Sequence, residues 1–358
     1  MNKNNSVFIT GSTGFLGSYL LKILLESGKR VYALSRRKKN ILSKERVLEM
    51  LKFWEFNIND DRYKNNLKII DGDISMLNLG LSSEDQQILI REVNTIFHSA
   101  ALAELRLPIE IARKVNVGGT KNVLDFALRC KNLKKVSHIS TAYVIGSKQG
   151  IDFNEDKLDV GQKFNNTYEQ SKFEAEILVH KYKKLGLKIL VFRPSLIMGD
   201  SKTGKTSNFK IFYQPLHFFA NNVFCSYPSN ESCSHNLINV DTVASAISIL
   251  SDTQEKGCYH LISPKSISMN SLIKSASEYF NFEMPKIVPF DKYDIDALTP
   301  TQKALMLPFY PYFNYTATII ANKTSNILLD HGFKTLAIDQ NNLNRIFRYC
   351  VSSGFIRM

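Results

Sequence analysis

A tyrosine and a lysine four residues apart, Tyr168 and Lys172, are the pair in this chain best suited to proton transfer. Residues 168–182 have a helical pattern, so both side chains should project from one face of a helix. A free tyrosine titrates at about pH 10, and a neighbouring ammonium group favours the phenolate. We therefore expect Lys172 to lower the pKa of Tyr168 towards neutral pH. The phenol could then transfer a proton while a hydride moves, and the lysine could hold the ribose of a nicotinamide.

A second hydroxyl is needed beside the phenol to orient a carbonyl oxygen. The predicted strand at residues 136–140 ends immediately before Thr141, and we assign this role to Thr141, with Ser140 as the alternate. His98 follows another predicted strand and is a further acid or base candidate, although a packing role is favoured. The predicted catalytic residues are thus Thr141, Tyr168 and Lys172.

The start of the chain predicts a dinucleotide-binding turn. An apolar strand at residues 7–9 is followed by Gly11, Gly14 and Gly17 and then by a helical pattern at residues 19–25. Glycines allow a tight turn and a close approach to a pyrophosphate, and the helix N-terminus supplies N–H donors. The predicted cofactor contacts in this turn are Gly11, Thr13, Gly14, Phe15, Leu16 and Gly17.

Two arginines, Arg36 and Arg37, follow the second predicted strand at residues 30–35. A dinucleotide-binding fold has the adenosine ribose at this strand end. An acidic residue there would hold the 2′-hydroxyl of NAD, whereas arginine accommodates the 2′-phosphate of NADP. The sequence therefore predicts NADPH, with a solvated basic turn as the alternative. Ala100 and Ala101, small residues at the end of the fourth strand, also fit a backbone lying against the cofactor.

Strands and helices alternate through the first part of the chain, which predicts an α/β fold with a Rossmann-type, doubly wound, mostly parallel sheet. We expect an NADP-binding domain at residues 1–198, to which residues 237–262 return or which they border. A smaller, mainly C-terminal, substrate-binding part should occupy residues 199–358, where aromatic residues cluster and regular strands are not expected. A helical insertion at residues 41–57 should bury Leu42, Val47, Leu48, Leu51 and Trp54.

Composition narrows the functional class. The 358 residues carry a net charge of +13, but the basic residues are spread along the chain without an aromatic-rich basic stripe, so nucleic acid is not an expected partner. The five cysteines are scattered, which predicts neither a metal site nor a disulfide framework. No apolar run is long enough to span a bilayer. The first residues lack an apolar signal core, which indicates a cytoplasmic protein.

A competing motif occurs at residues 199–206, where Gly-x-x-x-x-Gly-Lys-Thr matches the pattern of a nucleotide-binding P-loop. This would suggest an ATPase or kinase. The preceding apolar run contains Pro194, which is unfavourable in a central strand, and the upstream strands already form the dinucleotide fold. We therefore interpret this stretch as a loop over the cofactor or substrate.

The glycine spacing together with Tyr168 and Lys172 resembles the short-chain dehydrogenase/reductase superfamily. More of the chain, to about residue 250, resembles the thioester reductase and fatty acyl-CoA reductase branch of its extended members. The stretches that carry this resemblance are residues 9–17, 72–74 with 79–82, 96–101, 115–120 and 193–200, together with the helical insertion. The resemblance implies further cofactor contacts at Asp73 and Ile74, where the superfamily's aspartate contacts adenine, and at Asn116, Pro194 and Ile197. An asparagine at the place of Asn116 is usually a structural or proton-relay residue in the superfamily, and a simple mid-helix asparagine is the alternative.

The resemblance also implies a reaction. NADPH would reduce an acyl thioester, carried by coenzyme A or by an acidic acyl or peptidyl carrier protein, to an aldehyde, with a second reduction to the alcohol as an extension. The domains often fused to such reductases are absent from this sequence, which suggests a stand-alone reductase. A dehydrogenase acting on a ketone, an alcohol or a nucleotide sugar is the enzymatic alternative. A cofactor-sensing or scaffold protein is the non-enzymatic one, against which the intact Thr141, Tyr168 and Lys172 argue.

Overall fold

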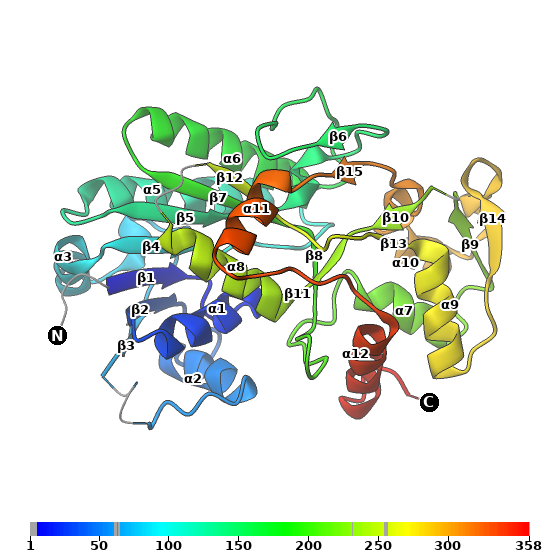
Figure 1. Ribbon diagram of the computed structural model, residues 1–358, viewed down its shortest axis with the longest axis horizontal. Coiled ribbons are helices and arrows are strands. Elements are labelled where there is room, and N and C mark those ends of the chain that lie inside the picture. The colour runs from blue at the N-terminus through cyan, green and yellow to red at the C-terminus, as the bar shows by residue number, and fades with distance from the viewer. Residues whose placement is uncertain (1–5, 61–62, 64, 231, 254–256, 358) are drawn as a thin grey trace.

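A computed structural model of the chain describes residues 6–357, apart from 61–62, 64, 231 and 254–256. Its central sheet contains seven strands: β1 (Ser6–Thr10), β2 (Arg30–Ser35), β3 (Leu67–Asp71), β4 (Thr95–His98), β5 (Lys135–Ile139), β7 (Ile189–Pro194) and β12 (Cys258–Leu261). All neighbouring pairs are parallel, in the order β12-β7-β5-β4-β1-β2-β3 (Figure 1). The order reverses between β1 and β4, where a doubly wound fold binds its ligand at the carboxyl ends of the strands. The predicted Rossmann-type fold is confirmed.

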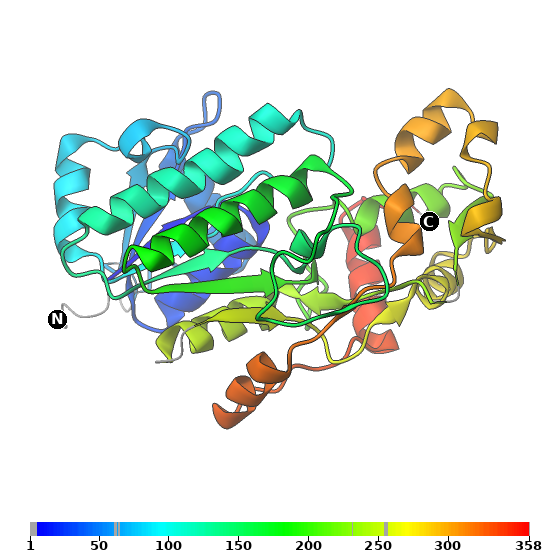
Figure 2. The same cartoon turned by 90° about the horizontal axis from the view of Figure 1, so that it is seen from above.

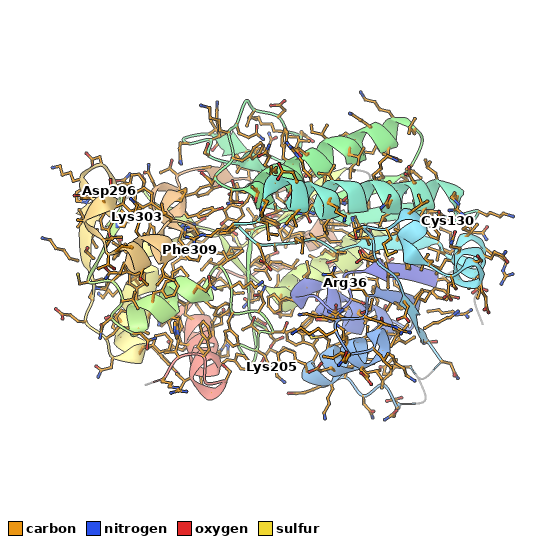
Figure 3. The ribbon with its side chains drawn as sticks, turned by 180° about the vertical axis from the view of Figure 1, so that it is seen from behind. Arg36, Cys130, Lys205, Asp296, Lys303 and Phe309 are labelled. Atoms are coloured by element: carbon orange, nitrogen blue, oxygen red, sulfur yellow. The ribbon has the colours of Figure 1, made fainter. Side chains whose placement is uncertain are left out.

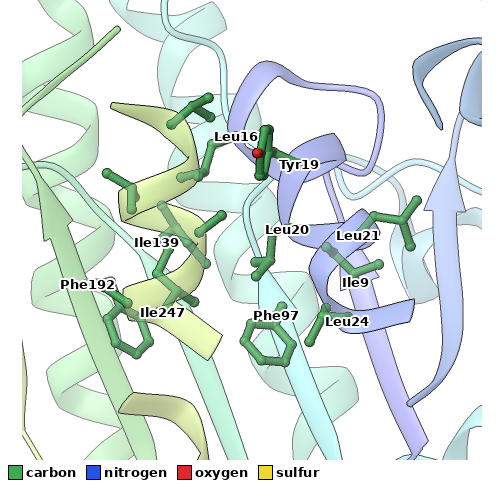
Figure 4. Packing of buried hydrophobic residues seen from close by; sticks show 14 of the residues in the cluster. Ile9, Leu16, Tyr19, Leu20, Leu21, Leu24, Phe97, Ile139, Phe192 and Ile247 are labelled. Carbon is green, nitrogen blue, oxygen red and sulfur yellow. The ribbon is translucent and has the colours of Figure 1, made fainter. Parts of the chain in front are cut away.

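Helices cover both faces of this sheet. One face carries α1 (Phe15–Glu26), α2 (Ser43–Phe53), α8 (Val240–Asp252) and α11 (Asn322–Asp330), and the other α3 (Ser83–Glu92), α4 (Ile109–Arg113), α5 (Gly119–Arg129) and α6 (Thr167–Lys184). Figure 2 shows α5 and α6 side by side over their face. The apolar positions of α1 recur at helical spacing, so Leu20 and Leu24 are fully buried against the sheet together with Ile247 from α8 (Figure 4). This packing fixes the end of α1 that faces the predicted cofactor site.

Two predicted helices differ in detail from the structure. The long helix expected from residue 110 to 130 is interrupted at Lys114–Gly118 by a π-helical turn that contains Asn116. In the inserted helix, α2, Val47, Leu51 and Trp54 are buried as expected and Leu48 is partly buried. Leu42, however, is 45% exposed, because it precedes the first helical residue and turns away from the core.

The second part of the chain gathers at one end of the sheet (Figures 1 and 2). It contains α7 (Tyr213–Ala220), α9 (Met269–Phe280), α10 (Pro300–Met306), α12 (Gln340–Ser352) and the 3₁₀ helix η6 (Tyr310–Asn314). The expectation of no regular strands there is wrong, because β9 (Ser226–Ser229), β10 (Ser234–His235), β11 (Leu237–Asn239), β13 (Ile267–Ser268), β14 (Lys286–Pro289) and β15 (Thr318–Ile319) are present, with β15 pairing β6 (Asp152–Phe153). Strand β8 (Leu196–Met198) lies just before this part and pairs with β11. Buried side chains of this part form an aromatic-rich core of their own.

Residues 237–262 contain α8 and the strand β12, which lies at the edge of the central sheet. Helix α11 also packs against these two elements, and its Leu328 joins their core. The division into two domains at residue 198 stays a prediction. Within the described residues, no helix has the length and apolar character needed to cross a membrane, and no cluster of acidic, histidine and cysteine side chains could hold a metal ion.

Candidate active site

The turn between β1 and α1 has the geometry of a pyrophosphate cradle. Gly11 has φ +75°, and a Cβ there would lie 2.6 Å from the backbone nitrogen of Ala100. A Cβ on Gly17 would lie 2.1 Å from the Gly11 carbonyl oxygen, so neither position accepts a side chain. Helix α1 has no side-chain N-cap and no acidic residue in its first turn. Its first N–H groups and positive dipole end are therefore available to an anion, and the cradle fits a dinucleotide.

The three predicted catalytic residues come together in a cavity of about 430 Å³. Thr141 directly follows β5, while Tyr168 and Lys172 occupy successive turns of α6. The Thr141 hydroxyl lies close enough to the Tyr168 phenol to lower its pKa, and both side chains line the same cavity. Ser140, the alternate, instead donates its hydroxyl to Glu176 Oε2 at 2.7 Å. The geometry therefore favours Thr141 as the hydroxyl beside the phenol.

The expected lowering of the Tyr168 pKa is wrong. Burial raises the pKa of Tyr168 to about 12, the nearby Thr141 hydroxyl opposes the rise, and the Glu169 carboxyl adds to it. The Nζ of Lys172 donates to the backbone oxygen of Ile139 at 2.8 Å, and its charge does not outweigh the effect of burial on the phenol. At neutral pH the phenol is therefore protonated, which is the form that donates a proton.

Glu176 and Arg193 form a buried ion pair, and its carboxylate acts on Lys172. Burial lowers the pKa of Lys172 to about 8, and the charge of Glu176, one turn further along α6, opposes this shift. Glu176 is fully buried and accepts from Arg193 Nη2 at 2.5 Å and Nε at 3.0 Å. Burial would raise the pKa of this carboxyl, but Arg193 and the other hydrogen-bond donors outweigh it, so the pKa is lowered. The pair supplies the negative charge that favours the ammonium form of Lys172.

Asn116 and His98 have structural partners in the candidate site. Asn116 Oδ1 accepts from the Leu102 backbone N–H at 2.8 Å, and its Nδ2 donates to the Ser171 hydroxyl at 2.9 Å. The π-helical turn thus ties the loop after β4 to the residue beside Lys172. His98 hydrogen-bonds the hydroxyl of Thr10 at 2.8 Å, and burial lowers its pKa to about 3. The packing role of His98 is therefore favoured over acid–base catalysis.

Arg36 and Arg37, which the sequence predicts to lie near the adenosine ribose, pair with different aspartates. The Arg36 Nη1 lies 3.4 Å from Asp73 Oδ2, and Arg37 pairs with Asp71 at 3.2 Å. Sequence reasoning missed Arg46 on α2, whose Nη1 donates to the Arg36 backbone oxygen at 2.6 Å. Burial and then the charge of Arg36 lower the pKa of Arg46. The two positive charges therefore lie close enough to repel each other. The position of Arg36 beside the first strands can be followed in Figure 3.

The remaining predicted contacts fall into two groups. Arg46 Nη2 also donates to Thr13 Oγ1 at 3.1 Å, which joins the glycine turn to the arginines. Ile74 packs against Gly119 behind the turn that contains Asp73, and the Ala100 backbone closes over Gly11. Those that line the cavity itself are Gly14, Phe15, Leu16, Gly17, Ala101, Tyr168, Lys172, Pro194 and Ile197.

The structure does not fit the competing P-loop motif. No helix begins directly after residues 199–206, since α7 starts at Tyr213. The Asp200 carboxylate accepts the backbone N–H groups of Lys202 and Thr203 at 3.1 and 2.9 Å, so the loop is closed on itself. Lys205 donates to Glu55 at 2.7 Å rather than pointing into a phosphate cradle. This stretch joins the two parts of the fold.

Comparison with known proteins identifies the relatives of this fold. The chain is 24% identical over 373 residues to a component of the linear gramicidin synthase of Brevibacillus parabrevis, covering 99% of this chain and 7% of that protein. It is 35% identical over 156 residues to fatty acyl-CoA reductase 1 of Mus musculus, covering 42% of this chain and 30% of that protein. The chain thus spans less than half the length of these curated relatives.

A solved structure matches over almost the whole chain. The terminal R domain from the myxalamid PKS-NRPS biosynthetic pathway has a TM-score of 0.87 and 25% identity, covering 99% of this chain and 92% of that one. The family model described as "Male sterility protein", an NAD-binding family, matches residues 9–247. The site therefore takes a nicotinamide cofactor. The chain belongs to the Male sterility protein family, in the thioester reductase and fatty acyl-CoA reductase branch of the extended short-chain dehydrogenases/reductases.

Proposed function

We propose that this chain is an NADPH-dependent reductase that converts an acyl thioester to an aldehyde. The observation that carries the proposal is that the hydroxyls of Thr141 and Tyr168 share one cavity with Lys172 and the end of the glycine turn. Two relatives support the choice of substrate, since one is named a fatty acyl-CoA reductase and the other is the terminal R domain of a synthetase pathway.

The side chains of the site have complementary parts in this reaction. Bound NADPH supplies the hydride for the thioester carbonyl carbon. Thr141 and Tyr168 donate hydrogen bonds to the carbonyl oxygen, which become stronger as negative charge develops there. Tyr168 then protonates this oxygen, and release of the thiol leaves the aldehyde. Lys172 holds the nicotinamide ribose and, through its charge, favours the developing anion. A second round on the aldehyde would give the alcohol.

Arg36 and Arg46 support NADPH over NADH as the cofactor. The Arg46 guanidinium contacts the Arg36 backbone oxygen at the end of β2 and Thr13 of the glycine turn, and the Arg36 guanidinium lies beside Asp73. A 2′-phosphate would relieve their mutual repulsion and accept paired donors from the planar guanidinium groups. Arg37, which pairs with Asp71, contributes less in this proposal than the sequence suggested. The site residues named in the sequence analysis otherwise keep their proposed roles.

The net charge of +13 supports an acidic carrier protein as the donor of the thioester, with coenzyme A as the alternative. A cytoplasmic location stays a prediction.

The proposal is tested by offering the purified protein NADPH with acyl-CoAs, acyl carrier proteins, ketones and nucleotide sugars. We expect NADPH consumption only with thioesters, and free thiol released in step with it. Oxidation of NADPH by ketones or turnover of nucleotide sugars, without thiol from any thioester, would replace this function with the alternative dehydrogenase activity. Failure to turn over any of the four classes would favour the non-enzymatic alternative.

A further inference from the structure

The cavity that contains Tyr168 continues away from the glycine turn into the aromatic core of the second part of the chain. Apolar side chains of α7, α9 and η6 line this extension, together with Phe309 just before η6: Leu216, Phe219, Leu272, Ile273, Phe309 and Phe313. Among the described residues that line the whole cavity, the charged side chains are Lys172 and the ion pair of Glu104 with Lys210. Glu104 and Lys210 are each about half exposed, so this pair belongs to the rim rather than the interior.

The polar groups inside the extension are neutral. Burial lowers the pKa of His235 to about 4, and its ring is stacked on Tyr315 with the ring centroids 5.9 Å apart. The Tyr312 hydroxyl donates to Glu169 Oε1 at 2.5 Å and accepts from Asn166 at 2.6 Å. These groups are already hydrogen-bonded or stacked within the protein. The extension therefore offers a ligand mainly apolar contacts, and no buried charge of the described residues to pair with.

The extension ends in a wall of phenylalanine rings. A second, much smaller void of about 10 Å³ lies behind it, and Phe219, Phe309 and Phe313 line both spaces. Phe219 and Phe313 each pack on Tyr227, with ring centroids 5.5 and 5.9 Å apart. Figure 3 shows Phe309 within the second part of the molecule, beyond the sheet. The rings are thus held in place and separate the reaction cavity from the void.

We propose that the acyl group of the substrate is an uncharged, apolar chain whose far end packs against Phe219, Phe309 and Phe313, and that these rings limit its length. This proposal rests on the proposed thioester reduction and names its substrate class. Each methylene that enters the extension should raise kcat/KM by about fourfold. Beyond the wall, added methylenes have no space and the gain is lost. An acyl group with an ammonium or a second carboxylate would bury a charge without a partner.

The test is a series of saturated acyl thioesters of increasing length on one thiol, with an aminoacyl thioester and a dicarboxylic monothioester of matched length. We expect a rise in kcat/KM to one optimum, then a fall, and charged acyl groups at least about 100-fold below neutral ones. Phe309→Ala joins the two spaces and should move the optimum about two to four carbons towards longer chains. Phe280→Ala is the matched control, because it removes a ring from the same core away from both spaces.

Two further variants cover the case in which Phe309→Ala fails to fold. Phe309→Leu should lengthen the preferred chain in the same direction, and Phe313→Trp should shorten it. Binding of primary alcohols of the same lengths, measured by calorimetry, gives a readout that does not need turnover. Thioester reduction without a length optimum, or with charged acyl groups preferred, would overturn the substrate assignment and leave the reductase activity standing. A second outcome is that alcohol binding stops at a chain length that changes in the Phe309 variants while no thioester is reduced. That result would support the assigned acyl site and overturn the proposed reductase reaction.

Discussion

The buried ion pair between Glu176 and Arg193 should control both the stability of the fold and the pH range of its activity. Replacing Glu176 with glutamine keeps the size of the side chain and a carbonyl that can accept from Ser140, whose hydroxyl now lies 2.7 Å from the carboxylate. It removes the charge that pairs with Arg193, which is 1% exposed. Leaving one buried charge without its partner typically costs about 3–5 kcal/mol of folding free energy.

Glu174 provides a matched control on the same helix. It pairs with Arg113 at 2.6 Å, but both side chains are partly exposed, at 28% and 48%. Exposed pairs contribute about 0–1 kcal/mol. Glu174→Gln should therefore leave the thermal midpoint almost unchanged, whereas Glu176→Gln should lower it clearly. If the two variants lose the same stability, the buried pair does not have the energetic role that its burial implies.

The pH dependence of turnover gives the sharper test. Lys172 is faced by Glu176 on α6 and by His98 and His138, whose pKa values burial lowers so that both are neutral. Turnover that requires the ammonium form should fall as pH rises through the Lys172 pKa of about 8. Without the carboxylate this pKa drops further, so the alkaline limb of kcat/KM should move to lower pH. The limb is measured over the pH range in which each variant remains folded.

The stability that Glu176 contributes to the fold should also depend on pH. The pKa of Glu176 is lowered in the folded state, so its stabilising contribution is present above the unfolded pKa and is lost as pH falls through the folded one. The difference in unfolding free energy between native protein and Glu176→Gln should therefore shrink in acid. An alkaline limb that stays in place in Glu176→Gln, while Glu174→Gln behaves as the native protein, would refute the link between this carboxylate and Lys172.

Three further predictions concern the site. Tyr168→Phe should lower kcat by about 10²–10⁴-fold with little change in NADPH affinity, measured by turnover and by cofactor titration; near-native turnover would remove the tyrosine from the mechanism. The double variant Arg36→Ala/Arg46→Ala should lose the preference for NADPH over NADH, by about tenfold or more in kcat/KM, while Arg37→Ala should keep most of it; the reverse pattern would reassign the phosphate site. Lys205→Ala should leave NADPH-dependent turnover intact, and ATP hydrolysis that depends on Lys205 would restore the P-loop hypothesis.

The local parts of the fold were predictable because their signals are short in sequence. The strand, glycine turn and helix at residues 7–25 lie next to one another in the chain, and the bounds of β2 agree with those expected. Tyr168 and Lys172 needed only the helical period to come together on α6. Thr141 could be named because small hydroxyl residues at a strand end have few other uses in such a cleft.

Features that depend on packing between distant segments could not be predicted in this way. Arg46 reaches Thr13 only because α2 folds back over the start of α1, and nothing in the residues around it indicates that contact. Strand β15 pairs with β6 across more than 160 residues, and both are two residues long, so neither has a periodic pattern. In both cases the tertiary fold, rather than the local sequence, decides the structure.

The predicted lowering of the Tyr168 pKa is wrong because the sequence does not show how deeply the phenol is buried. The spacing of four residues suggests that the ammonium of Lys172 lowers the pKa of the phenol, whereas burial raises it. In the structure burial is the larger effect and raises the pKa to about 12. A phenol with this pKa is a proton donor at neutral pH and a poor proton acceptor. Oxidation of an alcohol needs an acceptor at this position, whereas reduction of a carbonyl needs a donor. The burial of Tyr168 therefore keeps the phenol in the protonated form from which the proposed reduction would start.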